Sequence, residues 1–335
     1  MELRKVQRTN SGTFFVSLPK DWAERVGLDK GALLAVSESI DGRLRLDPQY
    51  DVERKPLNVV LKPTRYLDRE IVGKYLLGYD VICIEAKNHI LPSERTVVKQ
   101  ASSRLVGLEI VEENYARIVL QCLLEPTAFP PEKILRREYN IAASMHRDAV
   151  RAFLEGDVHL AKNVIARDDE VNRLYFLHVR ILRTVIQNPS LGEKLGIHSI
   201  DCLDYRLCAS LVETIGDRSV EIAYKTLALK GVKVSKEFSK LIGKFHSIVF
   251  EAQEKALKAF FGHDVVLAEE VRDEKTEIEN TFHQIESAAK KQSTEAVPLT
   301  LTVASSMYRI FDHSVDIADL VMPRKLSRRS NTCAF

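Results

Sequence analysis

Acidic side chains recur at four-residue intervals in the C-terminal half of the chain. Glu213, Asp217 and Glu221 follow one another at this spacing, and so do Asp312 and Asp316. Residues four apart lie on one face of a helix, where like charges repel by roughly a few tenths of a kcal/mol per pair. A metal ion or an Arg side chain from another helix would relieve this repulsion, and carboxylate oxygens are ligands for divalent cations and for iron.

Asp168 and Asn172 have the same spacing on the preceding predicted helix. The sequence therefore predicts a site for a divalent metal or iron on the following residues: Asp168, Asn172, Glu213, Asp217, Glu221, Glu279, Asp312 and Asp316. The alternative is that these acids form the solvated face of amphipathic helices, opposite Leu211 and Ile215. Periodicity alone leaves both interpretations open.

The helical half contains an internal repeat that places these acids in register. Ala149–Phe153 matches Ala256–Phe260, and Asp217–Ala223 matches Asp312–Ala318 in the same order. Two matching blocks in one order predict two copies of a three-helix unit, with a longer connection in the first copy. Asp157 and its counterpart Asp264 stand where helix N-caps are expected.

Enzyme signatures are absent from the sequence. Di-iron bundles place Glu-x-x-His on two helices, and none of the nine histidines follows a Glu or Asp at that distance. The chain has no Gly-x-Ser-x-Gly motif, no phosphate-binding glycine loop and no Cys/His nucleophile pattern. We therefore expect a protein that is not an enzyme, and a metalloenzyme is only the third hypothesis.

Basic residues cluster at the start of the chain. Arg4, Lys5 and Arg8 lie on or beside a predicted first strand, and Lys20 begins a short predicted helix. Two copies in a dimer would present a cationic patch to DNA phosphates, and the amide of Gln7 suits the edge of a base. The alternative is that these charges only keep a small β unit in solution.

Element patterns divide the chain into distinct regions. Four short strands and one short helix at the N-terminus bury too little surface for a stable monomer, so we expect a homodimer through this region. The predicted regions are a DNA-binding and dimerisation domain (1–49), a small α/β module (56–125), a helical domain (131–322, with repeats 131–230 and 234–322) and a flexible basic tail (323–335).

Composition indicates the class of protein. The net charge of +2 requires any nucleic-acid surface to come from local clustering of basic residues. The five cysteines are odd in number and include no Cys-x-x-Cys, which favours a reducing, cytoplasmic location. The charged start of the chain is not a signal peptide, and no apolar run of about 18 residues predicts membrane insertion.

The N-terminal region resembles the SpoVT/AbrB DNA-binding domain. The residues that carry this resemblance are Arg4–Arg8, Gly12–Pro19, Trp22–Gly27 and Lys30–Gly31. That family forms a swapped-hairpin β-barrel dimer and binds DNA with basic side chains near the start of each chain. The resemblance therefore implies a DNA-binding dimer.

The helical region resembles PhoU, a phosphate-uptake regulator of two three-helix repeats. Glu213 and Asp217 match its acidic motif, and Asp168 and Asn172 fall at the partner motif. In some members such acids bind multinuclear iron or other metals. The second copy departs from the pattern, because Tyr308 and Lys275 replace two of the acids.

The combined architecture resembles the archaeal phosphate-uptake regulators. It implies a multidomain α+β fold with an N-terminal swapped-hairpin β-barrel, a small central α/β module and an all-α pair of three-helix bundles. We expect a sequence-specific transcriptional regulator of phosphate uptake that binds DNA. Its helical sensor would bind metal, a transporter ATPase or a sensor kinase. The alternative is an adaptor that binds no DNA and regulates a phosphate ABC transporter or a sensor kinase by protein contact.

Overall fold

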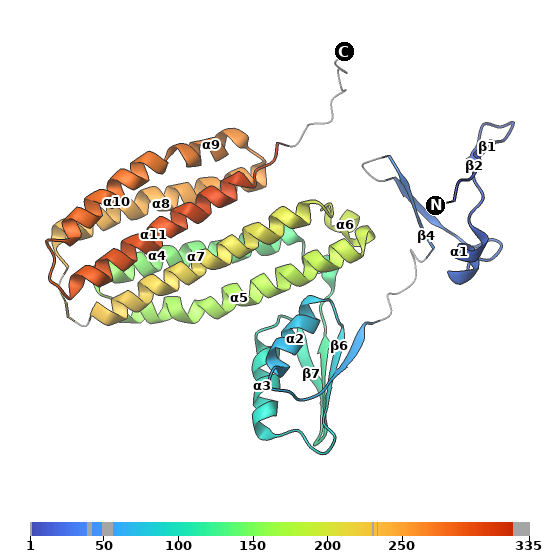
Figure 1. Cartoon of the computed structure of the whole chain (residues 1–335), viewed down its shortest axis with the longest axis horizontal. Helices are drawn as coiled ribbons and strands as arrows, with labels where there is room; N and C mark the ends of the chain where they lie inside the picture. The colour runs from blue at the N-terminus through green and yellow to red at the C-terminus, as the bar shows by residue number, and fades with distance from the viewer. Residues whose placement is uncertain (1, 39–41, 49–55, 230, 233, 324–335) are drawn as a thin grey trace, which may run out of the picture. The chain divides into compact units, whose positions relative to one another are not determined.

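The computed structural model describes residues 2–38, 42–48, 56–229, 231–232 and 234–323. The chain divides into two compact units, Met1–Lys55 and Pro56–Phe335. Figure 1 shows the first as a small β-rich unit and the second as a sheet module followed by long helices. The predicted basic tail lies outside the described residues from position 324 onwards.

The first unit consists of two separate hairpins and one short helix. Strand β1 (Gln7–Arg8) pairs with β2 (Phe14–Phe15), and β3 (Ala35–Glu38) pairs with β4 (Leu44–Asp47), both antiparallel. Helix α1 (Lys20–Arg25) follows β2. The described strands of one chain do not close into the predicted barrel.

None of the described residues in this first unit is buried. Many of its large apolar side chains are exposed, namely Leu3, Val6, Phe14, Phe15, Val16, Leu33, Val36 and Leu44. Isolated two-stranded hairpins are marginally stable in water, because they bury too little apolar surface to offset the entropy lost on folding. One copy of this unit therefore has no hydrophobic core of its own.

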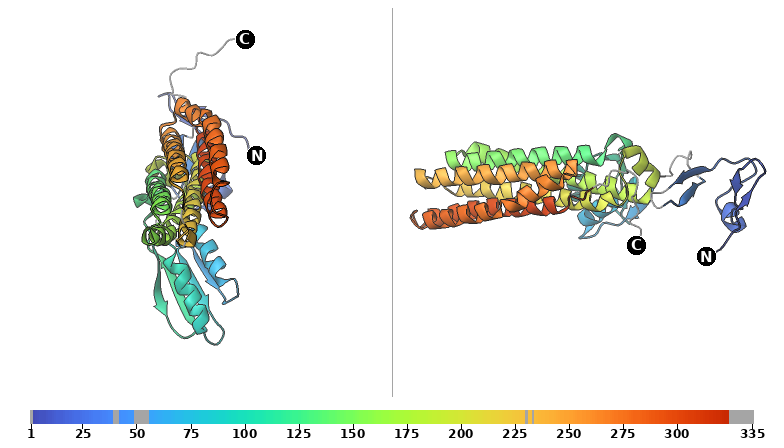
Figure 2. Two further views of the ribbon diagram at one scale, coloured as in Figure 1. Left: turned by 90° about the vertical axis from the view of Figure 1, so that its left-hand side faces the viewer. Right: turned by 90° about the horizontal axis from the view of Figure 1, so that it is seen from above.

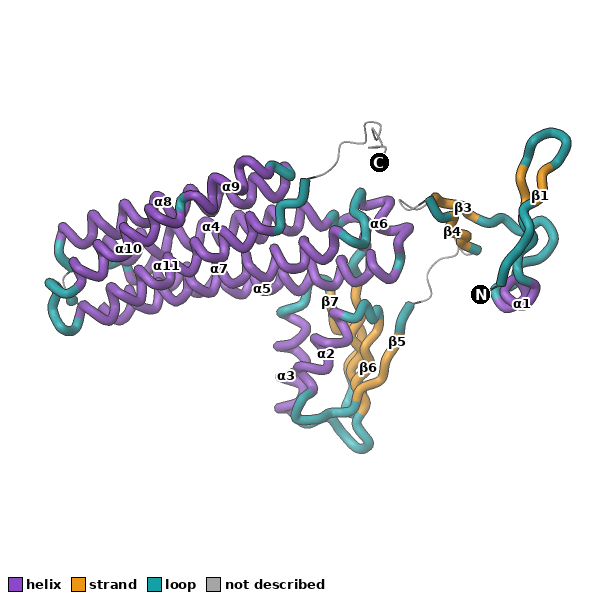
Figure 3. The backbone as a smooth tube through the Cα atoms, turned by 45° about the horizontal axis from the view of Figure 1, so that its top comes forward, coloured by secondary structure: helices purple, strands orange, loops and turns teal. Residues whose placement is uncertain are grey.

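The sheet module opens the second unit with alternating strands and helices. Its elements are β5 (Asn58–Leu61), α2 (Leu67–Leu76), β6 (Val81–Glu85), α3 (Pro92–Ser103), β7 (Leu108–Glu113) and β8 (Arg117–Cys122). The strand order is β5-β6-β8-β7, with β5 and β6 parallel and the other pairs antiparallel. Helices α2 and α3 cover one face of the sheet (Figure 3), which buries Ile71, Ile82 and Leu120 between the layers.

The helical part follows the short 3-10 helix η1 (Pro126–Ala128). The first copy comprises α4 (Pro131–Glu155), α5 (Val158–Gln187) and α7 (Asp201–Leu229), with α6 (Pro189–Leu195) in its longer connection. The second comprises α8 (Lys236–Gly262), α9 (Val265–Asp273), α10 (Lys275–Ala289) and α11 (Ala296–Asp319). Figure 2 shows these long helices running side by side in one bundle.

The second copy differs from the expected three helices. Its middle helix is interrupted at Glu274, which separates α9 from α10. At this break Glu274 accepts a hydrogen bond from Lys255 Nζ of α8 at 2.7 Å. Two helices, α9 and α10, thus stand where the sequence predicted the single middle helix of this copy.

The predicted N-caps are present at matching positions of both copies. Asp157 Oδ1 accepts hydrogen bonds from the backbone N–H groups of His159 and Leu160, both at 2.9 Å. Asp264 Oδ1 accepts one from Leu267 N at 3.1 Å. These bonds satisfy amide groups that the first turn of a helix leaves unpaired, so the repeated Asp fixes where each second helix begins.

One hydrophobic core runs through both copies of the repeat. Its buried side chains include Met145 and Val171 of the first copy and Phe245 and Phe311 of the second. Arg180 of α5 ties the sheet module to this bundle, because its Nη1 donates to the carbonyl oxygen of Tyr79 at 2.9 Å. None of the described helices combines the length and the apolar character that crossing a membrane would need.

Candidate functional site

Four predicted metal ligands meet on the adjacent helices α5 and α7. Asn172 Nδ2 donates to Asp168 Oδ2 at 3.0 Å on α5, and Glu213 and Asp217 face them from α7. Burial and the charges of Asp217 and Asp168 raise the pKa of Glu213 to about 7. These charges therefore act on Glu213 electrostatically. On a fully solvated helix face, water and salt would screen most of this interaction.

The pKa values of the other two carboxyls, Asp168 and Asp217, are also raised. Burial and the charges of Asp217 and Asp169 raise the pKa of Asp168, and the hydrogen bond from Asn172 offsets part of this. Burial also raises the pKa of Asp217, against the opposing charge of Arg218. This set of residues is called the acidic group below: Asp168, Asn172, Glu213 and Asp217.

A buried polar pair lies close to the acidic group. Glu138 of α4 is fully buried, and burial together with the charge of Glu213 raises its pKa well above the usual range. His178 Nδ1 of α5 lies 3.7 Å from Glu138 Oε2. Burial lowers the pKa of His178 to about 3, and Arg206 acts in the same direction. Sequence reasoning missed both residues, although a polar residue on the apolar face of an amphipathic helix was a usable signal.

Glu221 is held by other partners. Arg218 Nη1 donates to Glu221 Oε2 at 2.8 Å, and Ser306 Oγ of α11 donates to the same oxygen at 3.0 Å. The four-residue spacing had suggested that Glu221 shares a face with Glu213 and Asp217. The structure places its carboxylate at the seam between α7 and α11 instead.

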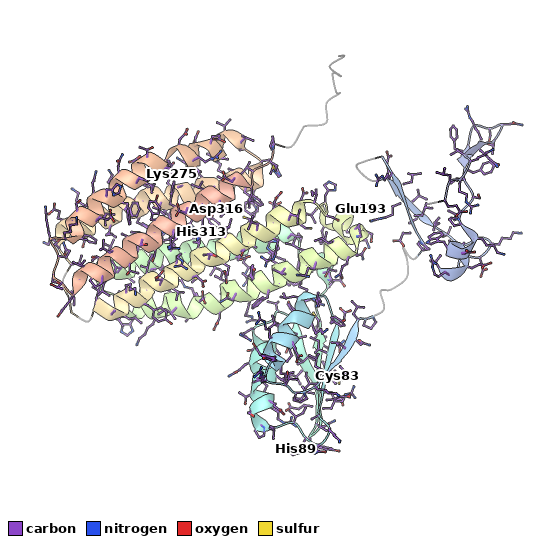
Figure 4. The ribbon with its side chains drawn as sticks, in the orientation of Figure 1. Cys83, His89, Glu193, Lys275, His313 and Asp316 are labelled. Atoms are coloured by element: carbon purple, nitrogen blue, oxygen red, sulfur yellow. The ribbon has the colours of Figure 1, made fainter. Side chains whose placement is uncertain are left out.

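The second copy brings its acids together with a cation. Burial and the charges of Asp312 and Glu279 raise the pKa of Tyr308. Burial raises the pKa of Asp312, while the nearby charges of His313 and Lys275 lower it. His313 Nδ1 lies 3.4 Å from Asp316 Oδ2, and Figure 4 marks Lys275, His313 and Asp316.

The chemical type of these residues suits a metal ion, but their arrangement in space does not. The oxygen donors of the acidic group, with carboxyl pKa values raised by burial and, for Asp168 and Glu213, by neighbouring acids, suit an oxygen-preferring cation. However, within the part of the chain that the structure describes, no three His, Cys, Asp or Glu side chains are arranged to hold one ion. In the second copy Lys275 already supplies a positive charge.

The predicted DNA-contacting residues are all exposed in the first unit. Arg4 pairs with Glu2, and Lys20 Nζ lies 3.6 Å from Glu24 Oε1. The Arg8 guanidinium lies 5.3 Å from the ring centre of Phe14. The structure places Gln7 and Arg8 in β1, Arg4 and Lys5 before it, and Lys20 at the first position of α1.

Comparisons with solved structures match the helical half. PhoU from Pseudomonas aeruginosa superposes with a TM-score of 0.51 at 20% sequence identity, covering 57% of this chain and 93% of that one. The phosphate transport system regulatory protein PhoU from Streptococcus pneumoniae gives a TM-score of 0.49 at 16% identity, covering 57% of this chain and 91% of that one. At 20% identity, the likeness to the Pseudomonas aeruginosa protein shows the fold alone.

None of the curated proteins matches this chain. The family model described as the PhoU domain matches residues 135–226 and 242–321, one segment in each copy of the repeat. The matched segments do not reach residues 1–49, so the SpoVT/AbrB resemblance stays a prediction. Since the two segments together cover more than half of the 335 residues, this chain belongs to the PhoU family.

Proposed function

We propose that this protein regulates phosphate transport by contact with a partner protein, the ATPase of a phosphate transporter or a sensor kinase. Membership of the PhoU family is the observation that carries this proposal. The proposal assigns no catalytic step to the chain. It favours the adaptor over the DNA-binding regulator as the primary function.

An apolar stripe at the start of α7 supports a protein partner. Leu203 and Leu207 are 63% and 50% exposed, and their spacing of four residues places them on one face of α7; Ile200, which is 67% exposed, lies in the turn directly before the helix. Exposed apolar residues gathered in this way mark surfaces that bind another protein. We name these three residues the α7 stripe and propose it as part of the partner interface.

The test is binding of the full chain to the purified transporter ATPase and to the cytoplasmic part of the sensor kinase, measured by biolayer interferometry. The double variant Leu203→Asp/Leu207→Asp should weaken binding at least tenfold, because it places charges in a desolvated interface. Val266→Asp is the matched control, since Val266 is 73% exposed on α9, in the other copy. Absence of binding to either partner would overturn the proposal.

A cation at the acidic group is a second element of the proposal. Asp168, Asn172, Glu213 and Asp217 would supply oxygen ligands to a divalent metal or iron. A bound cation stabilises the ionised carboxylates, so binding should release protons near pH 7, where Glu213 titrates. Calorimetry in two buffers of different ionisation enthalpy measures this release, and Glu213→Gln should remove it. Equal proton release in the variant would count against these ligands.

DNA binding is the second candidate function, favoured by the first unit. Its cations are exposed and it has no core of its own, so association with a second copy would cover its apolar side chains and join two sets of Arg4, Lys5, Gln7, Arg8 and Lys20. The test is fluorescence anisotropy with the upstream promoter DNA at several salt concentrations. Log affinity should fall by about 0.9 per phosphate contact with log salt.

The variant Arg4→Ala/Arg8→Ala distinguishes the two candidates. Loss of promoter binding, with a dimer intact by light scattering, supports DNA binding. A parent protein that binds its promoter no better than scrambled DNA at low salt leaves protein contact as the function. A monomeric parent protein would contradict the homodimer.

A further inference from the structure

A polar pocket of about 440 Å³ lies at the seam between α7 of the first copy and α11 of the second. Its polar lining comes from both helices, namely Arg218, Glu221, Thr302, Ser305, Ser306 and Arg309. The predicted metal ligands did not include any of these residues except Glu221. We propose that this pocket binds a small doubly charged oxyanion such as inorganic phosphate.

The charges of the pocket favour an anion. Two guanidinium groups face one carboxylate, and that carboxylate is already engaged by Arg218 Nη1 at 2.8 Å and Ser306 Oγ at 3.0 Å. Arg309 makes no ion pair with any residue that the structure describes. It lowers the pKa of Asp312, one helical turn on, without a contact of 4 Å or less. The pocket therefore keeps a positive excess.

Hydrogen-bond donors without partners line the same seam. Arg218 Nε is buried and has no hydrogen-bond partner among the described residues. The hydroxyl of Ser305 likewise donates to none of them, and the Arg309 guanidinium is free to donate several bonds. Planar guanidinium groups bind phosphate oxygens through paired hydrogen bonds, and such charge-assisted bonds are about twice as strong as bonds between neutral groups. A tetrahedral oxyanion in the pocket would accept hydrogen bonds from the Ser305 hydroxyl and the Arg309 guanidinium.

The repeat itself shows that the fold does not require this arrangement. The register that matches Asp217 with Asp312 pairs Arg309 with Thr214 and Thr302 with Leu207. The ion pair of Arg218 and Glu221 becomes His313 and Asp316 in the other copy. The pocket thus combines two arginines with hydroxyl groups, whereas the matching positions of the repeat carry His313 and Thr214 in place of the arginines. These residues are therefore specific to one seam rather than part of the repeated framework.

The site would join the two copies. Because Arg218 belongs to the first copy and Arg309 to the second, an oxyanion bound by both adds a contact across the repeat boundary. Binding to the folded state alone raises stability in proportion to the logarithm of ligand concentration over Kd. This inference is independent of partner binding through the α7 stripe, so either can fail without the other.

The experiment is isothermal titration of the full chain with inorganic phosphate at pH 7.5 and constant ionic strength, with acetate as the comparison anion. Phosphate should bind and acetate should not. Arg309→Gln and Arg218→Gln should each weaken binding at least tenfold. Arg151→Gln is the matched control, because Arg151 is an exposed, ion-paired arginine of α4, and it should leave the affinity unchanged.

Glu221→Gln gives a result of opposite sign. It removes the competing carboxylate and frees Arg218, so phosphate affinity should rise several-fold. Circular dichroism melts of each variant verify folding, and Arg309, which is exposed, is not expected to affect it. No phosphate binding by the parent protein, or binding that Arg309→Gln leaves intact, overturns the proposal. So does an affinity that falls in Glu221→Gln.

Discussion

The two copies of the repeat share a buried framework but differ in how they balance acidic charge. In the first copy, burial and the charges of Asp217 and Asp168 raise the pKa of Glu213, and burial and the charge of Asp217 raise the pKa of Asp168. In the second, Tyr308 and Lys275 occupy these two positions, and Lys275 lowers the pKa of Asp312. The second copy thus carries a lysine at the position where the first copy carries the carboxylate of Asp168.

The largest expected difference between the copies is in stability, at the residue directly before the matched aspartates Asp217 and Asp312. Phe311 is fully buried, whereas its counterpart in the first copy is Gly216. We expect Phe311→Ala to lower the free energy of unfolding by about 3–5 kcal/mol, because it removes a large apolar side chain and leaves a cavity. Urea denaturation followed by circular dichroism measures this loss.

Gly216→Ala is the control at the matched position. A Cβ at Gly216 would lie 3.5 Å from Val171 Cγ1, an ordinary contact distance. Ala also favours a helix over Gly, so the change should be neutral or stabilising by up to about 1 kcal/mol. Similar losses at 216 and 311 would show that the two copies pack their cores alike, contrary to the comparison.

A smaller change in the free energy of unfolding is expected from the acidic group as the pH changes. The folded pKa of Glu213 is raised to about 7 from its ordinary value of 4.5. Its contribution to stability is therefore complete below pH 4.5 and is lost as the pH rises to 7, because the folded state holds the proton more tightly. Glu213→Gln should abolish this part of the slope, on the order of 1 kcal/mol after solvent screening.

Stability measured from pH 4.5 to 7 in both proteins provides the comparison. Tyr308→Phe, at the matched position of the second copy, should leave the slope unchanged, since Tyr308 does not titrate in that range. Identical slopes in the parent protein and in Glu213→Gln would show that the neighbouring acids do not act on Glu213. Adding the cation that the acidic group prefers should flatten the parent's slope toward that of the variant.

Much of the helical architecture was predictable because local signals agree with the tertiary fold. The repeat and the N-caps Asp157 and Asp264 appear in the structure at their predicted places. The break at Glu274 was not predictable, since neither Gly nor Pro marks it. The environment of Glu221 was also hidden, because its partner Ser306 is distant in sequence and lies on another helix. Each four-residue step also turns about 40° around a helix, so Glu221 drifts away from Glu213.

The N-terminal unit shows a different limit. The first two strands are only two residues long each, Gln7–Arg8 and Phe14–Phe15, so Arg4 and Lys5 lie outside the strand. Strand propensity predicts where a chain can be extended, but a strand forms only where backbone partners are present. Within one chain only the tips of this hairpin pair with each other. A second copy would be a source of further partners, which is why the exposed apolar residues of this unit bear on dimerisation.

The smallest predicted effect concerns the ends of the first helix in each copy. Gly156 ends α4 with a φ of 69°, and His263 ends α8 with a φ of 51°. The left-handed conformation costs a residue with a Cβ roughly 1 kcal/mol more than Gly. We therefore expect His263→Gly to stabilise the protein by about 0.5 kcal/mol, since the greater freedom of Gly in the unfolded chain offsets part of the gain.

The reverse change Gly156→His completes the exchange. It should destabilise by about 1 kcal/mol, because His would be forced into the same left-handed conformation. The two sites are distant in sequence and cap different helices, so the double variant should show the sum of the two effects. Unfolding curves of all three variants against the parent measure these small differences. If His263→Gly is destabilising, His263 must make a contact that outweighs its backbone conformation, and the two copies would then end their first helices for different physical reasons.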